Sequence, residues 1–290
     1  MKARFLSSVV VAALVGAGLA LVAAGALADD GKPDPTNAHA RMALFRDVNF
    51  VSTCRFSHRA PDDPIVFPGK PGLSHDHSFV GNVSTNAFST LASLKAARAT
   101  TCERPGDTAA YWMPTLMVDG NVVLPRGATI YYRRRTTDHV RPFPQGLKMV
   151  AGDTHATTPQ SLRVTFWNCG VATTIPPSSS APACPDELGS GLRLHVNFPN
   201  CWDGKRLDSE DHKSHMAYSV AGACPATQPV AVPAISLIYR YPVTGQHEVE
   251  LMSGGQYSGH ADFFNAWDAH TLAHLVDSCL NALRHCGRGN

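Results

Sequence analysis

A chain of 290 residues with 44% hydrophobic side chains is long enough to bury a sizeable core, as one large domain or two small ones. Its formal net charge is only +2. So nearly balanced a charge argues against nucleic-acid binding, which needs a surplus of Lys and Arg over the phosphates.

The N-terminal segment has the three parts of a secretory signal. Lys2 and Arg4 form a short positive region, an apolar run covers residues 5–22, and Ala26-Leu27-Ala28 provides a small-x-small cleavage site. We therefore expect residues 1–28 to be a signal peptide, 29–46 a flexible lead-in, and 47–290 a single secreted globular domain. An uncleaved membrane anchor is the alternative, because the apolar run is long for a signal. After cleavage we expect no membrane association, and the oligomeric state stays open.

All eight cysteines lie beyond the leader, and an even number in an exported chain predicts disulfides. Pairing cysteines that are near neighbours in the sequence closes three short loops. The two cysteines that remain would then form one longer pair. The expected pairs are Cys169–Cys184, Cys201–Cys224, Cys279–Cys286 and Cys54–Cys102.

Short strand-like segments recur along the chain, and many are separated by Pro- and Gly-containing turns. Residues 192–198 alternate cleanly, with Leu192, Leu194 and Val196 on one side and Arg193 and His195 on the other, as in a half-buried strand. The other expected strands are 48–54, 111–118, 121–124, 129–133, 162–167, 235–241 and 248–251. The short run 133–135 of three arginines suggests a solvated strand edge or turn.

Two helices are expected beside these strands, a short Ala-rich one at 90–99 and a C-terminal one at 265–284 with an apolar stripe at helical spacing. The sequence thus predicts a mainly β (α+β) fold. We expect an antiparallel β-sandwich or barrel-like sheet with long loops and two helices, cross-linked by disulfide bonds.

Three segments rich in His and Asp are the candidates for chemistry. His75 and His77 flank Asp76 in an expected loop, where an extended chain would put both imidazoles on one side. That arrangement suits two metal ligands or a base with its orienting partner, although surface histidines without a role are common. His260 and Asp262 are likewise a base with its orienter or two metal ligands, unless Asp262 caps the last helix.

The densest polar segment follows Cys201. It contains Trp202, Asp203, Asp208, Asp211, His212, Lys213, His215 and Tyr218 within eighteen residues. A solvated loop tied down by the cysteine is the plain interpretation. The three-residue spacing of His212 and His215 favours a functional interpretation, because it would place both rings on one face of a helical turn.

Several ordered motifs give the chain a family resemblance. They occupy 63–69, 74–87, 110–114, 143–152, 201–218 and 259–268. On these motifs the chain resembles the DUF1996 family, a secreted domain-of-unknown-function family of fungi and actinobacteria, over about residues 47–279. The resemblance implies secretion, and an association with cell-wall or carbohydrate-binding modules in larger fungal relatives. The sequence departs from the family pattern at Ser78, where similar proteins often carry an acidic residue. A carboxylate metal ligand at that position is therefore in doubt.

Because loops at one end of a sandwich can meet, we expect the three His- and Asp-bearing segments to face one cleft. The leading hypothesis is a secreted enzyme that cleaves a cell-wall or environmental polysaccharide. Its expected catalytic residues are His75, His77, Asp211, His212, Lys213, His215, His260 and Asp262. The expected sugar-binding residues are Trp112, Trp202, Asp203 and Tyr218, with a core position as the alternative for Trp112.

The reaction type is open between hydrolysis, for which Asp208, Asp211 and Asp262 could supply carboxylates, and a lyase or metal-assisted route. Two other functions stay in view: a non-catalytic module that binds glycan or cell wall, and a protein that binds a divalent metal. The candidate metal ligands are His75, His77, His212, His215 and His260.

Overall fold

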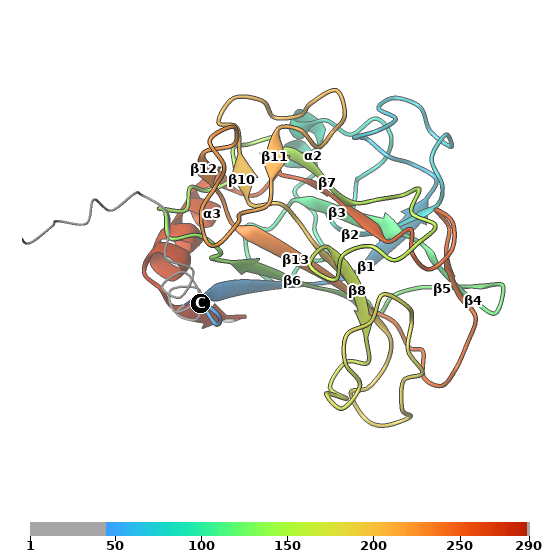
Figure 1. Cartoon of the computed structure of the whole chain (residues 1–290). Helices are drawn as coiled ribbons and strands as arrows, with labels where there is room; N and C mark the ends of the chain where they lie inside the picture. The colour runs from blue at the N-terminus through green and yellow to red at the C-terminus, as the bar shows by residue number, and fades with distance from the viewer. Residues whose placement is uncertain (1–44, 289–290) are drawn as a thin grey trace, which may run out of the picture. The chain divides into compact units, whose positions relative to one another are not determined.

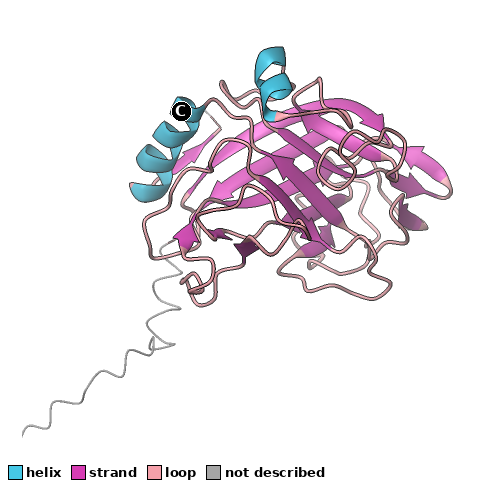
Figure 2. Cartoon of the chain, turned by 90° about the horizontal axis from the view of Figure 1, so that it is seen from above, coloured by secondary structure: helices cyan, strands magenta, loops and turns pink. Residues whose placement is uncertain are grey.

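The computed structural model describes residues 45–288, so the expected leader and most of the expected lead-in lie outside the described residues. Strands dominate the fold, and the two helices lie at its margin (Figure 2). The expectation of a mainly β, antiparallel, barrel-like fold is confirmed. Within residues 45–288, no helix has the length and apolar character needed to cross a bilayer.

One large sheet organises the molecule. Its strands follow the order β7-β15-β3-β2-β1-β6-β13-β9-β8, and β16 adds to β1. Every neighbouring pair along that path is antiparallel, and β7 comes back towards β9, which makes the sheet nearly closed. Figure 1 shows β1 and β6 running side by side. Its strands are β1 (Asn49–Ala60), β2 (His77–Gly81), β3 (Ala110–Pro114), β6 (Gly127–Arg133), β7 (Lys148–Gly152), β8 (Thr165–Asn168), β9 (Arg193–Asn197), β13 (Ala234–Arg240), β15 (His260–Phe264) and β16 (His285–Gly287).

Two small sheets and two helical segments complete the fold. One small sheet has the order β11-β10-β12 and the other β14-β4-β5. Their strands are β4 (Leu116–Val118), β5 (Asn121–Val123), β10 (Cys201–Trp202), β11 (Met216–Ala217), β12 (Val230–Ala231) and β14 (Val249–Leu251). The helical segments are α2 (Leu91–Ala97) and α3 (Ala269–Leu275), and α3 continues into the π-helical η1 (Val276–Asn281).

The C-terminal helix begins later than expected. Residues up to Phe264 belong to β15, and Asp268 caps α3 by accepting the Thr271 N–H. Asp262 therefore lies inside a strand, and the alternative that it caps the last helix is wrong.

The sheet separates two hydrophobic cores. Because successive side chains on a strand point to opposite faces, Val80 and Phe263 enter the large inner core. Their neighbours Phe79 and Phe264 point outwards into a second, smaller core, which also contains Trp112 and Leu94. This small core lies between the outer face of β2, β3 and β15 and the segments that cover it, including α2.

Four disulfides fasten the loops, and all four expected pairs are confirmed. They are Cys54–Cys102, Cys169–Cys184, Cys201–Cys224 and Cys279–Cys286. No cysteine is free.

Candidate metal centre

Three histidines converge on the outer face of β2 and β15. His77 begins β2 and lies opposite Pro114 on β3, and the register between β3 and β15 brings His260 level with the same proline. His75 reaches the two rings from the segment before β2. Its ring centroid lies 4.3 Å from that of His77 and 4.9 Å from that of His260. Of the three polar segments expected to face one cleft, the structure brings the histidines of the first and third together. His77, His260 and Asp262 lie on strands and not in loops.

Backbone carbonyls orient two of the imidazoles. The Nδ1 atom of His77 lies 3.0 Å from the Asp62 carbonyl oxygen, and that of His260 lies 2.8 Å from the Ser258 carbonyl oxygen. Each Nδ1 must donate to its carbonyl, so each Nε2 keeps a free lone pair. A carbonyl that fixes the tautomer in this way is the usual outer partner of a metal-bound histidine.

The free nitrogens face one another. His260 Nε2 and His75 Nε2 are 3.1 Å apart, and His77 Nε2 is buried with no hydrogen-bond partner among the described residues. Two imidazole nitrogens bound to one tetrahedral zinc ion at its usual bond length would lie about 3.3 Å apart. Without a metal, the short contact is a hydrogen bond from His75 Nε2–H to the lone pair of His260.

Two carboxylates complete the cluster. Asp262 is 1% exposed, and neither of its oxygens has a hydrogen-bond partner within the described residues. Asp63 accepts the N–H groups of Ile65 and Val66 through Oδ1. One ligand atom from each of Asp63, His77 and Asp262 lies within 4.8 Å of the others, and the same holds for His75, His77 and His260. The two groups share His77, so the structure offers a set of three imidazole ligands and, on the other side of His77, a set of one imidazole and two carboxylates. Either set suits zinc or a neighbouring first-row metal.

Burial sets the protonation of the centre. Desolvation lowers the pKa of His75 to about 4 and that of His260 to about 3, and it lowers the pKa of His77 well below its ordinary value. At neutral pH the three imidazoles are therefore uncharged and able to coordinate. Desolvation also raises the pKa of Asp63, and it raises that of Asp262 well above the ordinary range, with the charge of Asp63 adding to the effect on Asp262. A cation at this place would favour the ionised carboxylates.

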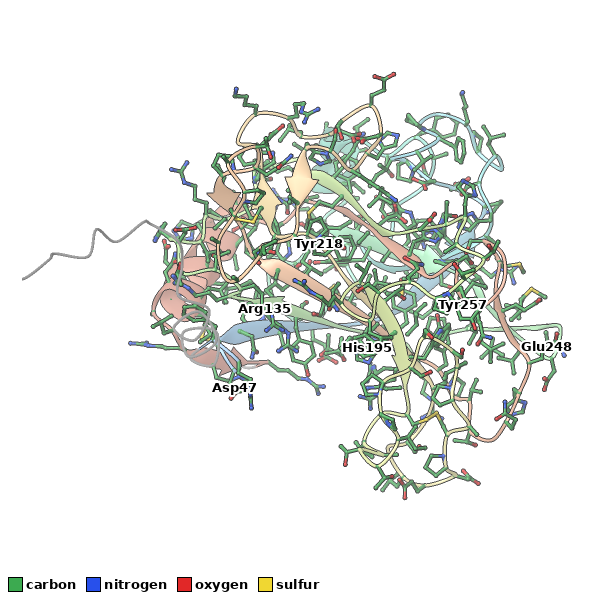
Figure 3. The ribbon with its side chains drawn as sticks, in the orientation of Figure 1. Asp47, Arg135, His195, Tyr218, Glu248 and Tyr257 are labelled. Atoms are coloured by element: carbon green, nitrogen blue, oxygen red, sulfur yellow. A yellow bond between two sulfur atoms is a disulfide. The ribbon has the colours of Figure 1, made fainter. Side chains whose placement is uncertain are left out.

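Lys213 is the member of the second polar segment that approaches the centre. Its Nζ donates to the carbonyl of Gly152, the residue that pairs with His260 across β7 and β15. Its charge lowers the pKa of Asp262, after the larger opposing effects of burial and Asp63. A cavity of about 290 Å³ opens beside it, lined also by Gly152, Asp153 and Tyr218. Figure 3 labels Tyr218, which is only partly buried and donates its hydroxyl to the Asn197 carbonyl.

The rest of that segment builds its own loop. His215 is fully buried between Ser209 Oγ and the Lys148 carbonyl, whereas His212 binds Asp208 at 2.9 Å. Asp211 accepts the N–H groups of Lys213 and Ser214, and these bonds hold its pKa well below the usual range. The expected helical turn is wrong, because His212 has a φ of 56° and the two rings have separate partners.

The expected sugar-binding aromatic residues lie in different environments. Trp112 is 0% exposed and packs against Phe79 in the small core, so it offers no face to a sugar, as its alternative core position implied. Trp202 is partly exposed and donates its indole N–H to the Arg206 carbonyl, and Asp203 binds the Arg206 side chain at 2.7 Å. Of the expected set, only Tyr218 lines the cavity next to the centre.

Asp63 is the site residue that sequence reasoning missed. It stands in an acidic, proline-containing turn of the kind that usually faces solvent, and only its position within a family motif marked it. Asp76, which separates the two histidines, instead accepts the Thr115 hydroxyl and pairs with Arg59. Ser78 points to the inner side, where its hydroxyl meets that of Thr115.

Residues 63–267 match the model of a family described as Domain of unknown function (DUF1996). The chain belongs to the DUF1996 family. The DUF1996 match spans more than half of the chain and contains all five residues of the candidate centre. No curated protein and no solved structure matches the chain.

Proposed function

We propose that this DUF1996 protein is a secreted metal-dependent enzyme that cleaves an extracellular polysaccharide. The observation that carries the proposal is the convergence of three neutral imidazoles, one of which, His77, also lies close to two buried carboxylates. Within residues 45–288, the carboxylate of Asp262 has no hydrogen-bond partner. Two of the histidines are already held in the tautomer that coordination requires.

The chemistry assigned to the centre follows from its surroundings. A bound divalent cation supplies Lewis-acid polarisation and a water of lowered pKa. His75 is the only partly exposed histidine of the three, so its side of the centre is the one that substrate would approach. Lys213 is exposed and lies beside His260, where its ammonium group would stabilise negative charge that develops on a substrate oxygen.

The polysaccharide part of the proposal is supported by the adjoining cavity. Tyr218 contributes a flat ring, and Asp153, Gln160 and Lys213 contribute polar groups along the same wall. Rings beside polar groups are the usual partners of sugars, whose faces are apolar and whose edges carry hydroxyls. Four disulfides fit an oxidising compartment outside the cytosol, where such a polymer is met.

Metal analysis of the purified protein tests the centre. After loading with zinc, manganese or copper and removal of the excess, we expect about one ion per wild-type chain, and retention falls away in a His75→Ala/His77→Ala double variant. His274→Gln is the matched control, because His274 is an exposed histidine on α3. Equal metal content in the double variant and the control would refute the centre.

Activity on a panel of polysaccharides tests the reaction. The metal-loaded protein is expected to release product, and chelation followed by readdition of metal should abolish and restore that release. Binding without product in the loaded wild-type protein would instead favour the second candidate, a glycan-binding module.

A further inference from the structure

The outer face of the other half of the sheet carries an unusual concentration of arginine. On β9 and β13, the outward residues Arg193 and Arg240 are direct cross-strand partners. The next residue in that row is Gly127 on β6, and the one after it is Arg55 on β1. Like charges directly opposite each other destabilise a sheet, so nothing in folding alone favours this row.

The absence of a side chain at Gly127 leaves space for the Arg240 side chain. A Cβ at this position would lie 2.4 Å from the Cys54 carbonyl oxygen and 3.3 Å from the Arg240 guanidinium. The guanidinium of Arg240 therefore occupies the space in which a side chain at Gly127 would stand.

The arginines of this face lack acidic partners at contact distance. Within residues 45–288, Arg55, Arg133, Arg193 and Arg240 form no salt bridge. Two acidic groups interact electrostatically with these arginines, but only beyond contact distance. They are Asp47, which acts on Arg133, and Glu103, which acts on Arg240. Within the described part of the chain, the Nε–H groups of Arg133 and Arg240 are buried without an acceptor, so the protein does not neutralise either guanidinium group through this nitrogen.

Flat rings alternate with these charges. Arg133 lies over the Tyr131 ring at 4.2 Å, and His195 stacks on Phe166 at the same centroid separation. Burial, together with the charges of Arg193 and Arg133, lowers the pKa of His195 to about 3, so this ring is neutral at pH 7. Figure 3 labels His195 beside β8 and Arg135 nearer to α3.

We propose that this face, formed by Arg55, Arg133, Arg193, Arg240, Tyr131 and Phe166, with the buried His195 supporting the Phe166 ring, binds an acidic polysaccharide that carries carboxylate groups. A guanidinium presents a planar fork of donors that matches a carboxylate, and the intervening rings suit the apolar faces of sugars. The near-neutral net charge of the chain favours a polymer of moderate charge density over nucleic acid.

A hydrogen bond at the end of β9 links this side of the sheet to the cavity beside the candidate centre. Asn197 at the end of β9 accepts the Tyr218 hydroxyl on its carbonyl, and its side chain donates to the Arg163 carbonyl. Tyr218 itself lines the cavity that holds Lys213. The inference therefore deepens the proposed function by naming an acidic glycan as the substrate class, and it rests on that function for the choice of a glycan.

Binding to polygalacturonate, compared with its fully methyl-esterified form, is the experiment. We expect the wild-type protein to bind the acid form with an affinity that falls steeply as salt rises, and to bind the ester at least tenfold more weakly. In an Arg55→Gln/Arg193→Gln/Arg240→Gln variant, affinity for the acid form should fall at least tenfold. The matched control is Lys70→Gln/Lys95→Gln/Lys205→Gln, which removes the same charge from exposed positions elsewhere and should bind as wild type.

Three results would overturn the inference: no binding of the acid form by wild type, equal affinity of the two triple variants, or tighter binding of single-stranded DNA than of polygalacturonate. Arg55→Gln alone, at an exposed position, gives the same test with a smaller expected loss should the triple variant not fold. Metal content measured on the same preparations separates the two proposals. The arginine variant should keep its ion, and the His75→Ala/His77→Ala variant should keep its affinity for the polymer.

Discussion

At the scale of single residues, the carboxylate of Asp262 has no hydrogen-bond partner within residues 45–288, which is the observation that most favours a metal at the proposed centre. A buried polar group without a partner destabilises a protein, so Asp262 should be a liability in the metal-free chain. We predict that Asp262→Asn leaves the melting temperature of the metal-free protein unchanged or raises it. The same variant should lose most of the stabilisation by added zinc, which for wild type is about 2.7 kcal/mol at a hundredfold excess over Kd.

Calorimetry with and without metal checks this prediction. A carboxylate that merely supports the fold would give the opposite pattern, with a lower melting temperature in the absence of metal and an undiminished response to zinc.

A second buried acid, Asp107, provides a test by pH. It accepts the hydroxyls of Ser52 and Tyr111, and burial raises its pKa to about 7 from an ordinary 3.8. The folded state therefore holds a proton that the unfolded chain has released. The resulting stability is fully present below about pH 4 and is lost as pH rises through about 7.

We predict that Asp107→Asn reduces the fall in unfolding free energy between pH 5 and 7, by up to about 1.4 kcal/mol per pH unit. Urea titrations at several pH values measure it, with Asp186→Asn at an exposed position as the control. An unchanged slope would show that Asp107 is ionised in the folded protein.

At the scale of elements, sequence patterns predicted most strands of the large sheet, including β3, and missed β2, β7 and β15. β9 alternates between Leu194 or Val196 and polar neighbours, which makes its period visible. β2 and β15 are buried on both faces, yet their outward positions carry His77, His260 and Asp262. These polar groups remove the apolar signal that a doubly buried strand normally shows, so the candidate ligands themselves concealed these two strands.

The pairing of β7 with β15 depends on Gly152. Its φ is 85°, and a Cβ there would lie 2.4 Å from the Gly259 carbonyl oxygen and 2.8 Å from His260 Cα. We predict that Gly152→Ala destabilises the protein and weakens metal binding, because β15 must shift and carry His260 with it. Gly120→Ala is the matched control, since Gly120 also has a positive φ but faces open space. Equal metal affinity in the two variants would contradict the prediction.

At the scale of the whole molecule, the four disulfides could be paired from spacing alone because three of them close short loops. The proximity of His75 and His260 could also be predicted, because both segments carry histidine and aspartate residues of the kind that bind metals. The participation of Asp63 and the exclusion of His215 were not predictable. They depend on which face of the sheet each segment covers, and that is fixed by the packing of distant strands.

The longest disulfide loop should matter most for global stability. Cys54 and Cys102 are 48 residues apart, whereas Cys279 and Cys286 are 7 apart. Loop-closure entropy predicts that replacing the first pair by alanine lowers the free energy of unfolding by about 4 kcal/mol, and the second by about 2 kcal/mol. Denaturant unfolding of the two double variants measures the difference, and a reversed order would show that local packing outweighs chain entropy.

The most direct test of the account is X-ray absorption at the zinc edge of the loaded wild-type protein. We predict one zinc ion per chain, with a first shell of nitrogen and oxygen at about 2.0–2.1 Å and the outer-shell scattering of three imidazoles. His75→Ala/His77→Ala should lose that scattering. A shell without imidazole, or a spectrum unchanged in the double variant, would contradict the claim that His75, His77 and His260 hold a metal ion.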